Sequence, residues 1–426
     1  MVASAAELFS FITSHIEAFL KTHHSDCFNP SETKRPFSLG LVFSYPVYQN
    51  AINQGILLRW TKGFDIPDVV GQDVCKLLQN ELDLRNLPVR VTALVNDAAG
   101  TIMSRAYSLP LSKTRTSIGA IFGTGTNGVY LEKLSKITKP LDGHYDTSTG
   151  EMFISVEWGS FNNHLSVLPN TPYDAELNAV SVNPGNQMFE KRVSGMFLGE
   201  LLRTITLEMH MDPNFKLFQV LDSHTALADE ERLAFFTRWA VDSSLLSAAE
   251  ADSSDGLKTL REKIAESFGL PIAVISLEDA QVVKIIANAI GRRAARLAGM
   301  AIGAVVLQSG RLNDPVTPLT AGTETKQWLS IDKSLSRNAP TPTPEEGDGY
   351  GDDFREFEIV DVGVDGSLIE FYPGFEAYMR EALRAIAGIG TAGEKRVRIG
   401  IAKDGSSVGA AIIALLAGEQ LRNDGN

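Results

Sequence analysis

One short apolar segment constrains the fold of this chain more than any other feature. Residues 89–95 (VRVTALV) have the apolar composition of a buried strand, and Asn96 and Asp97 follow them directly, before the small residues 98–101 (AAGT). Two explanations are open at this point. Either the strand leads into a helix that Asp97 caps, or Asp97 is a catalytic carboxylate at the carboxyl end of a sheet strand, where open α/β sheets bind their ligands.

The length and the charge of the chain limit the classes of protein to consider. At 426 residues the chain is long for one hydrophobic core, so two lobes are expected. Hydrophobic residues make up 44% and charged residues 21%, which is typical of a soluble globular protein. The formal net charge of -13 leaves no broad basic surface to neutralise a phosphate backbone, so nucleic acid is not an expected partner.

The cysteines and the most apolar segment bear on the compartment. Cys27 and Cys75 cannot build a disulfide framework and lack metal-ligand spacing, so a reducing compartment, the cytoplasm, is expected and no metal ligand is predicted. Residues 294–307 (AARLAGMAIGAVVL) are the most apolar stretch, but they include Arg296 and fall short of a membrane span. The first residues show no basic region before an apolar core, so no signal peptide is expected.

Hydrophobic spacing predicts the order of helices and strands. Ser4 followed by Glu7 is a capping-box pattern, so the chain opens on a helix. Residues 332–353 carry proline, glycine and acidic side chains with almost nothing to bury, which predicts a flexible, solvated acidic loop. Further helices are expected at residues 73–82, 185–206, 284–308 and 409–418, from 373 onward and within 227–267; strands are expected at 37–47, 89–97, 357–371 and 396–402, and two more surround a turn within 117–132.

Three glycine-rich turns follow strand-like segments. They are Gly123-Thr124-Gly125-Thr126, Asp365-Gly366-Ser367 and Asp404-Gly405-Ser406-Ser407. Each offers backbone N–H groups and a hydroxyl without a bulky Cβ, which suits an anion, and the last leads into a helix N-terminus, which favours phosphate. Each alone is more typical of an ordinary turn, and the sequence has neither a Walker A loop nor a GxGxxG motif.

Two further carboxylates stand beside turn residues. Glu157 precedes Trp158 and Gly159, and Glu190 follows a turn that enters a helix. A carboxylate accepts hydrogen bonds from two neighbouring hydroxyls, so such groups suit a polyhydroxylated ligand. Taken alone, each is more typical of a helix N-terminal acid or a solvated charge.

Together these motifs resemble the eukaryotic hexokinases. LGLVFSYPVYQNAINQGILLRWTKGF (39–64) is similar to the sugar-binding stretch of that family, LVND (94–97) to the segment of its catalytic aspartate, and IFGTGTNG (121–128) to its second phosphate loop. EWGSF (157–161) and NPGNQMFEK (183–191) are similar to its sugar-binding glutamate segments, and DGSL (365–368) and DGSSVGAA (404–411) to its nucleotide loops. The motifs follow the family's order, and the resemblance implies an α/β fold, the two-lobed actin-like ATPase (ribonuclease H-like) fold.

The resemblance also implies an activity and a site. The implied reaction is ATP-dependent phosphorylation of a hexose, glucose first among candidates, at its 6-hydroxyl. Asp97 would take the hydroxyl proton as the oxygen attacks the γ-phosphorus of ATP, with Mg²⁺ as cofactor, and the small residues after Asp97 would leave room for substrate. The implied sugar-binding residues are Ser44, Thr61, Lys62, Asn96, Asn127, Glu157 and Glu190, and the implied nucleotide-binding residues are Thr124, Gly366, Ser367, Gly405 and Ser406.

The implied domain division follows the two lobes. Residues 1–96 would form a small lobe completed by a C-terminal helix at 405–426, and residues 97–404 would form a large lobe that includes the acidic loop. Closure of the lobes over the sugar would exclude water and protect ATP from hydrolysis.

This sequence also departs from the family pattern. It has no Asp-Leu-Gly-Gly-Thr-Asn loop, which in the family grips phosphate and helps organise Mg²⁺, and Ala98 stands where a threonine is usual. We therefore expect a small lobe without its first strands, unpaired strand edges at residues 37–44 and 89–95, and impaired activity. The alternatives are a catalytically inactive sugar-binding regulator and an incomplete gene model of an ordinary member. A protein partner at the acidic loop is a minority hypothesis.

Overall fold

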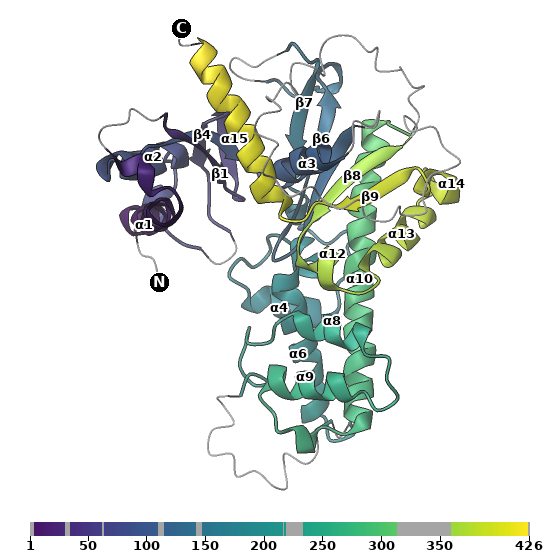
Figure 1. The fold of residues 1–426 in the computed structure, drawn as a ribbon. Helices are drawn as coiled ribbons and strands as arrows, with labels where there is room; N and C mark the ends of the chain where they lie inside the picture. Colours follow the sequence, from purple (N-terminus) through teal and green to yellow (C-terminus); the bar gives the residue numbers. More distant parts are fainter. Residues whose placement is uncertain are drawn as a thin grey trace.

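The computed structural model describes residues 4–29, 35–61, 64–109, 115–141, 147–215, 217–218, 233–312 and 359–424 (Figure 1). Its strands form a five-stranded sheet, a two-stranded parallel sheet and a hairpin. The expected acidic loop at 332–353 lies outside the described residues, as does Lys62.

The five-stranded sheet, called the large sheet below, has the strand order β7-β6-β5-β8-β9. β6 is antiparallel to both β5 and β7, whereas β8 is parallel to β5 and to β9. Because the register pairs Ile121 with Asp365, the turns that follow β5 and β8 lie side by side at one edge. The strands are β5 (Thr116–Phe122), β6 (Thr126–Lys133), β7 (Glu151–Ser155), β8 (Val360–Asp365) and β9 (Val397–Ile401).

The small sheet pairs β1 (Phe37–Val42) with β4 (Val89–Val95) in parallel. α1 (Ala5–His23) and α2 (Val74–Leu84) share one apolar cluster with this sheet, and Ala93 and Val95 face the other way, toward α15 (Gly405–Asp424). Among the described residues β1 pairs with β4 alone. The separate hairpin consists of β2 (Val47–Ala51) and β3 (Gln54–Leu57).

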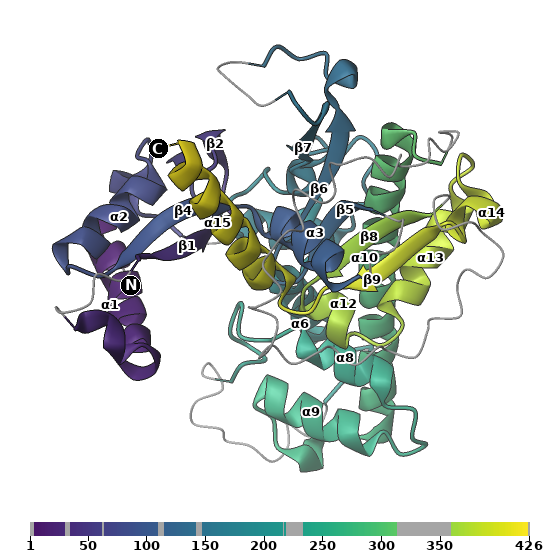
Figure 2. The same cartoon turned by 45° about the horizontal axis from the view of Figure 1, so that its top comes forward.

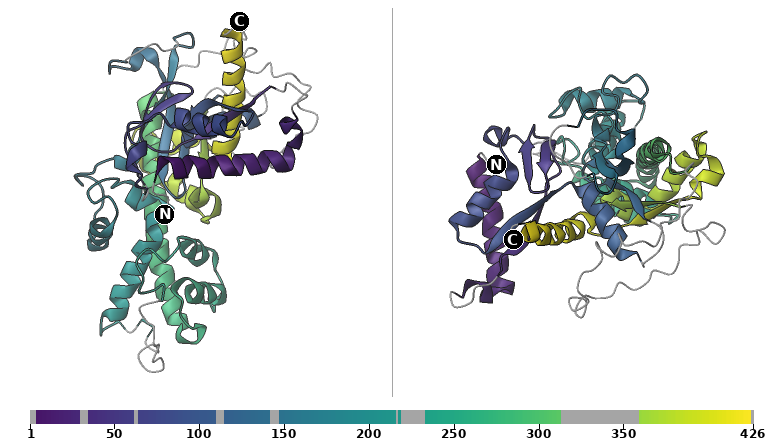
Figure 3. Two further views of the ribbon diagram at one scale, coloured as in Figure 1. Left: turned by 90° about the vertical axis from the view of Figure 1, so that its left-hand side faces the viewer. Right: turned by 90° about the horizontal axis from the view of Figure 1, so that it is seen from above.

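Two crossing helices join the sheets (Figure 2). α3 (Asp97–Ser108) leaves the small sheet at the end of β4 and packs on β5 and β8 of the large sheet, whereas α15 leaves the large sheet after β9 and packs on β1 and β4. The helices touch backbone to backbone, because a Cβ on Gly409 would lie 1.8 Å from the carbonyl oxygen of Gly100. Seen from above, α15 lies between the two sheets (Figure 3).

Most of the other helices gather around one long helix that contacts β5 and β6 of the large sheet. α10 (Leu277–Ser309) is the long green helix that runs from the large sheet down to α8 and α9 in Figures 1 and 3. The others are α4 (Pro172–Val180), α5 (Glu190–Val193), α6 (Gly195–Met211), α8 (Ser244–Ala251), α9 (Lys258–Phe268), α12 (Ser367–Phe371), α13 (Phe375–Ala385) and α14 (Gly390–Glu394), with short 3-10 helices at Ser25–Phe28, Pro67–Val69, Leu134–Lys136, Trp158–Ser160 and Ile272–Val274.

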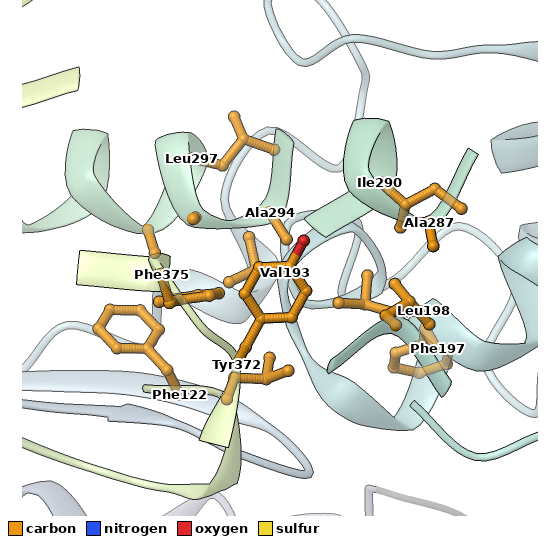
Figure 4. Close-up of a cluster of buried hydrophobic side chains, with 14 of the residues drawn as sticks. Phe122, Val193, Phe197, Leu198, Ala287, Ile290, Ala294, Leu297, Tyr372 and Phe375 are labelled. Atoms are coloured by element: carbon orange, nitrogen blue, oxygen red, sulfur yellow. The ribbon is translucent and has the colours of Figure 1, made fainter. Parts of the chain in front are cut away.

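One apolar core fixes the ends of the large sheet relative to these helices (Figure 4). Phe122 at the end of β5 lies against Phe375, with ring centroids 6.0 Å apart, and Tyr372 reaches into the same cluster from the end of α12. Val193, beside Glu190 on α5, is fully buried there. The end of β5, the end of α12 and the helix α5 therefore share one rigid support.

Several expected elements have different bounds. The strand expected at 37–47 ends at Val42, and a second strand begins at Val47, because Pro46 between them has no N–H for a ladder. The helix expected at 185–206 is two helices, since Ser194 has an extended backbone (φ -88, ψ 147) between α5 and α6. Residues 367–371 of the strand expected at 357–371 are helical, because Gly366 turns the chain with φ +118.

Other expectations are confirmed in type but not in length. Ser4 caps α1, its Oγ accepting the N–H of Glu7 at 3.2 Å. α10 begins before the expected residue 284, because Ser276 and Asp279 form a complete capping box. Of the helical region expected within 227–267, the structure describes α8 and α9. In the part of the chain that the structure describes, each helix is too short or too polar to cross a bilayer.

The two cysteines are free thiols in different surroundings. Cys75 on α2 is buried, and that burial, with the nearby Asp73 carboxylate, raises the pKa of its thiol to about 12. An unfolded thiol ionises at about 8.5, so between these values the folded chain binds more protons than the unfolded chain. This contribution to stability is complete below the lower pKa and is lost as the pH rises through the higher one.

The free energy of unfolding should therefore fall above about pH 9 in part because of Cys75. We expect the wild type to lose about 1–2 kcal/mol more than a Cys75→Ala variant between pH 9 and pH 10.5. Urea denaturation at the two pH values measures this difference. Equal losses in both proteins would show that the thiol ionises alike in the folded and unfolded chains.

Candidate active site

A cavity lies where the two sheets face each other, and side chains from both sides line it. It encloses about 490 Å³ of empty space, open solvent included. Six of the seven expected sugar-binding residues and the expected base meet here; Lys62, the seventh, lies outside the described residues. The lining residues are Ser44, Tyr45, Pro46, Thr61, Asn96, Asp97, Ile121, Gly125, Thr126, Asn127, Glu157, Gly159, Gln187 and Glu190.

Asp97 is the first residue of α3 and faces this cavity. Asn96 is the N-cap, with its Oδ1 accepting the N–H of Ala98 at 3.0 Å, and the Oδ1 of Asp97 accepts the same N–H at 2.9 Å. The strand thus leads into a helix, as the first explanation has it, but Asn96 rather than Asp97 is the N-cap. Asp97 lines the cavity at the carboxyl end of β4, and its catalytic role stays a prediction.

The small residues after Asp97 pack against neighbouring elements. Ala98 is fully buried, and a Cβ on Gly119 of β5 would lie 2.2 Å from the Ala98 carbonyl oxygen. A Cβ on Gly100 would lie 2.7 Å from the carbonyl oxygen of Ser406 on α15. These residues let α3 pack closely on β5 and α15, and they are not among the residues that line the cavity; that they also leave room for substrate stays a prediction.

Glu157 and Asn127 form a paired wall of the cavity. The Nδ2 of Asn127 donates to the Oε1 of Glu157 at 2.8 Å, and the backbone N–H of Glu157 donates to the Oδ1 of Asn127 at 3.0 Å. The Oγ of Ser155 donates to the same Glu157 Oε1 at 2.7 Å. Glu157 has a left-handed backbone with φ +53, a strained conformation that occurs often where a side chain must be aimed at a ligand.

Glu190 is the buried carboxylate of the cavity. It starts α5, and its Oε2 accepts the N–H of Thr126, the first residue of β6, at 3.1 Å. The neighbouring Lys191 donates to the Oδ1 of Asn178 at 2.9 Å and to the carbonyl oxygen of Asn183 at 2.8 Å. Burial, with the nearby Arg192, lowers the pKa of Lys191 to about 8. These bonds hold the turn before Glu190 against α4.

The opposite wall is held by an aromatic cluster of the small-sheet side. Tyr45 packs edge-on against Trp60 at 4.8 Å between centroids, and Trp60 stacks on Phe64 at 5.7 Å. The indole N–H of Trp60 donates to the carbonyl oxygen of Ile66 at 2.8 Å. Because Ser44 and Thr61 are the chain neighbours of Tyr45 and Trp60, this cluster fixes their positions at the cavity.

A second cavity adjoins the turns that follow β5 and β8. It encloses about 580 Å³, open solvent included, and Thr124 and Ser367, two of the expected nucleotide-binding residues, line it. Gly366, with φ +118, lies against the Phe122–Gly123 backbone, so the two turns touch. The remaining lining residues are Gly195, Met196, Trp239, Ala240, Val241, Asp242 and Ser243.

The third glycine-rich turn lies apart from the linings of both cavities. Gly405 and Ser406 start α15, and the N–H of Ser406 donates to the Oδ2 of Asp365 at 3.2 Å. Asp365 also accepts the N–H of Gly366 through its Oδ1 at 2.8 Å. The carboxylate therefore ties the start of α15 to the turn that carries Ser367.

Sequence reasoning missed several residues that line the cavities. Gln187 lies inside the quoted segment 183–191 and Thr126 inside 121–128, so the motifs reached their neighbourhood without assigning them. Residues 239–243 carry no motif. Tertiary contacts bring them to the site. Ser243 packs so closely against Gly195 that a Cβ on Gly195 would lie 3.1 Å from the Oγ of Ser243.

Comparisons with known proteins agree with this geometry. Two family models described as Hexokinase match residues 1–107 and 117–416. The glucokinase of Aspergillus niger is 45% identical over 430 residues, which cover 98% of this chain and 78% of that protein, and glucokinase-1 of Saccharomyces cerevisiae is 37% identical over 428 residues, covering 96% and 75%. The solved structure of a hexokinase from Schistosoma mansoni complexed with glucose has a TM-score of 0.70 at 29% identity, covering 97% of this chain and 76% of that one.

The large sheet, the crossing helices and the cavity between the sheets define an α/β protein of the actin-like ATPase fold, as expected from the motifs. The family follows from the extent of the matches, which reach from residue 1 to residue 416. This chain belongs to the hexokinase family.

Proposed function

We propose that this chain transfers the γ-phosphoryl group of ATP to the 6-hydroxyl of a hexose, with glucose as the first candidate. One observation carries the proposal: amide, hydroxyl and carboxylate side chains from six separate stretches of the chain line one cavity, with Asp97 among them. The A. niger and S. cerevisiae relatives are named glucokinases, which supports glucose as the sugar.

The proposed roles follow the chemistry of each group. Glu157 and Glu190 accept hydrogen bonds from ring hydroxyls. The remaining hydrogen-bond donors and acceptors of the sugar pair with the side chains of Asn96, Asn127, Ser44 and Thr61. Lys62 belongs to the same proposed set. Asp97 accepts the proton of the 6-hydroxyl as that oxygen attacks phosphorus, which is the positioned-base role of phosphoryl transfer.

The second cavity is the proposed place of the nucleotide. Thr124 and Ser367 offer hydroxyls at its wall. Gly366, Gly405 and Ser406 lie outside the lining and belong to the proposed nucleotide-binding set, with Asp365 bonding both of their turns. Mg²⁺ keeps phosphate oxygens and waters as most of its ligands and would neutralise charge on the transferring group. Among the described residues no group of three His, Cys, Asp or Glu side chains could hold a metal alone, which is compatible with a metal that arrives on ATP.

The domain division and the compartment belong to the proposal as well. Residues 1–96 with 405–426 are the proposed small lobe and residues 97–404 the large lobe, which matches the way α15 packs on β1 and β4. The cytoplasm is the proposed compartment, where two free thiols stay reduced and ATP is available.

A second candidate is a sugar-binding regulator that does no chemistry. It is favoured by one observation: the second cavity, as described, is lined only by residues from 124 onward, so the small-sheet side contributes no phosphate donor there. Loss of one preorganised donor lowers turnover by about 10²–10³-fold. Both candidates require the hexose to bind in the first cavity.

The two candidates separate in one experiment. The purified chain is incubated with glucose and MgATP, and the product is identified by mass spectrometry and phosphorus NMR. We expect glucose 6-phosphate from glucose and no phosphorylated product from 6-deoxyglucose, which lacks the attacking hydroxyl. Binding of glucose without any phosphorylated product would favour the regulator, and no binding would contradict both.

A further inference from the structure

We infer that Glu250 is a positioning residue for the nucleotide: its carboxylate holds together the two walls of the second cavity. The inference rests on the proposed function, in which this cavity holds ATP. Glu250 lies outside the lining, so it would act through the residues that it bonds.

The two walls come from distant parts of the chain. Residues 239–243 form one wall and continue directly into α8, where Glu250 lies near the C-terminal end. Ser367 forms part of the other wall and is the first residue of α12, which ends one residue before Tyr372. A bond between α8 and Tyr372 therefore links the supports of both walls.

The carboxylate of Glu250 makes that bond with both of its oxygens. The hydroxyl of Tyr372 donates to Oε2 at 3.1 Å, and the hydroxyl of Tyr378 on α13 donates to Oε1 at 2.8 Å. The side-chain amide of Asn288 on α10, in the orientation that satisfies its hydrogen bonds, donates to Oε2 at 2.9 Å. One carboxylate thus joins α8 to α10, α13 and the residue that follows α12.

Packing prevents Tyr372 from taking another position easily. Its side chain is 3% exposed and lies among Phe122, Val193 and Phe375 (Figure 4). Its hydroxyl fills the space beside Gly291 of α10, where a Cβ would lie 2.1 Å from the hydroxyl oxygen. Burial and the Glu250 charge both raise the pKa of Tyr372, so the hydroxyl stays protonated and donates to the carboxylate.

Removing the carboxylate should loosen the nucleotide cavity and spare the sugar cavity. Glu250→Ala leaves two buried or half-buried tyrosine hydroxyls without their acceptor, and the walls at residues 239–243 and at Ser367 lose their shared support. Glu250→Gln keeps an acceptor oxygen and adds an NH₂ that one tyrosine oxygen can accept, so it should restore much of the function.

Steady-state kinetics and calorimetry test the inference. We expect Glu250→Ala to raise the KM for ATP about tenfold and Glu250→Gln less than threefold, with kcat and the KM for glucose within twofold of the wild type in both. Glu262→Ala, which removes an exposed glutamate from the adjacent α9, is the matched control and should change neither KM.

A second readout separates this inference from the proposed function. Binding of a non-hydrolysable ATP analogue is measured by calorimetry on the same proteins, with thermal unfolding to show that each is folded at the assay temperature. Weaker binding in Glu250→Ala alone supports the inference. Equal binding in wild type and Glu250→Ala, or an equal rise in the KM for glucose, would overturn it and leave the proposed function intact. No nucleotide binding by the wild type would overturn both.

Discussion

Replacing Asp97 with asparagine should lower kcat for hexose phosphorylation by about 10²–10⁴-fold, the usual contribution of a positioned general base. Asparagine keeps an oxygen that can accept the N–H of Ala98, which Asp97 Oδ1 accepts at 2.9 Å, so α3 should still begin at the same residue. Asn96, the N-cap, is unchanged. The substitution therefore removes the base and little else, and the KM for the hexose should stay within a few-fold.

A coupled assay of sugar phosphate formation measures this loss. Asp255→Asn is the matched control, because it makes the same chemical change at an exposed position and should leave kcat unaltered. If Asp97→Asn retained more than a tenth of the wild-type kcat, Asp97 would not be the base. If instead the KM for the hexose rose a hundredfold at unchanged kcat, Asp97 would bind sugar without moving its proton.

Replacing Gly409 with valine should destabilise the protein by about 3 kcal/mol, at the upper end of the range for overpacked sites. The Cβ would lie 1.8 Å from the Gly100 carbonyl oxygen and 2.7 Å from its Cα, and both are backbone atoms that cannot rotate away. α3 and α15 would have to separate. Since Asp97 lies one turn before Gly100 on α3, activity should fall together with stability.

Thermal and urea unfolding measure this change, with Ala411→Val as the control. Residue 411 lies two positions further along α15 and is exposed, so valine there meets solvent rather than α3. We expect the control to change stability by less than about 1 kcal/mol. A Gly409→Val protein as stable as the control would mean that the two helices do not cross as closely as the structure has them.

The sequence predicted residues in the turns that follow strands. It missed residues that only tertiary packing brings to the cavities. Thr124 and Ser367 were predicted from the resemblance, because their glycine-rich turns match the family's phosphate and nucleotide loops, and the sheet register brings both turns to one edge. By contrast, residues 239–243 reach the second cavity only through tertiary contacts, such as that between Ser243 and Gly195. No local pattern encodes such a contact.

The segment after Asp97 also shows what sequence reasoning alone cannot determine. Its small residues were read as space for a ligand, yet Ala98 and Gly100 are buried against β5 and α15. Sequence shows that a residue is small but not which neighbour requires it to be small. The break at Ser194 is similar, since an apolar period that continues through 185–206 hides the extended backbone that separates α5 from α6.

The central claim is that groups from both sides of the cavity bind a single hexose, and calorimetric titration with glucose tests it most directly. We expect one glucose per chain in the wild type, with binding weakened at least tenfold both in Thr61→Val, on the small-sheet side, and in Glu157→Gln, on the large-sheet side. Glucose binding that is unchanged by either substitution, or absent at millimolar sugar in the wild type, would contradict the claim.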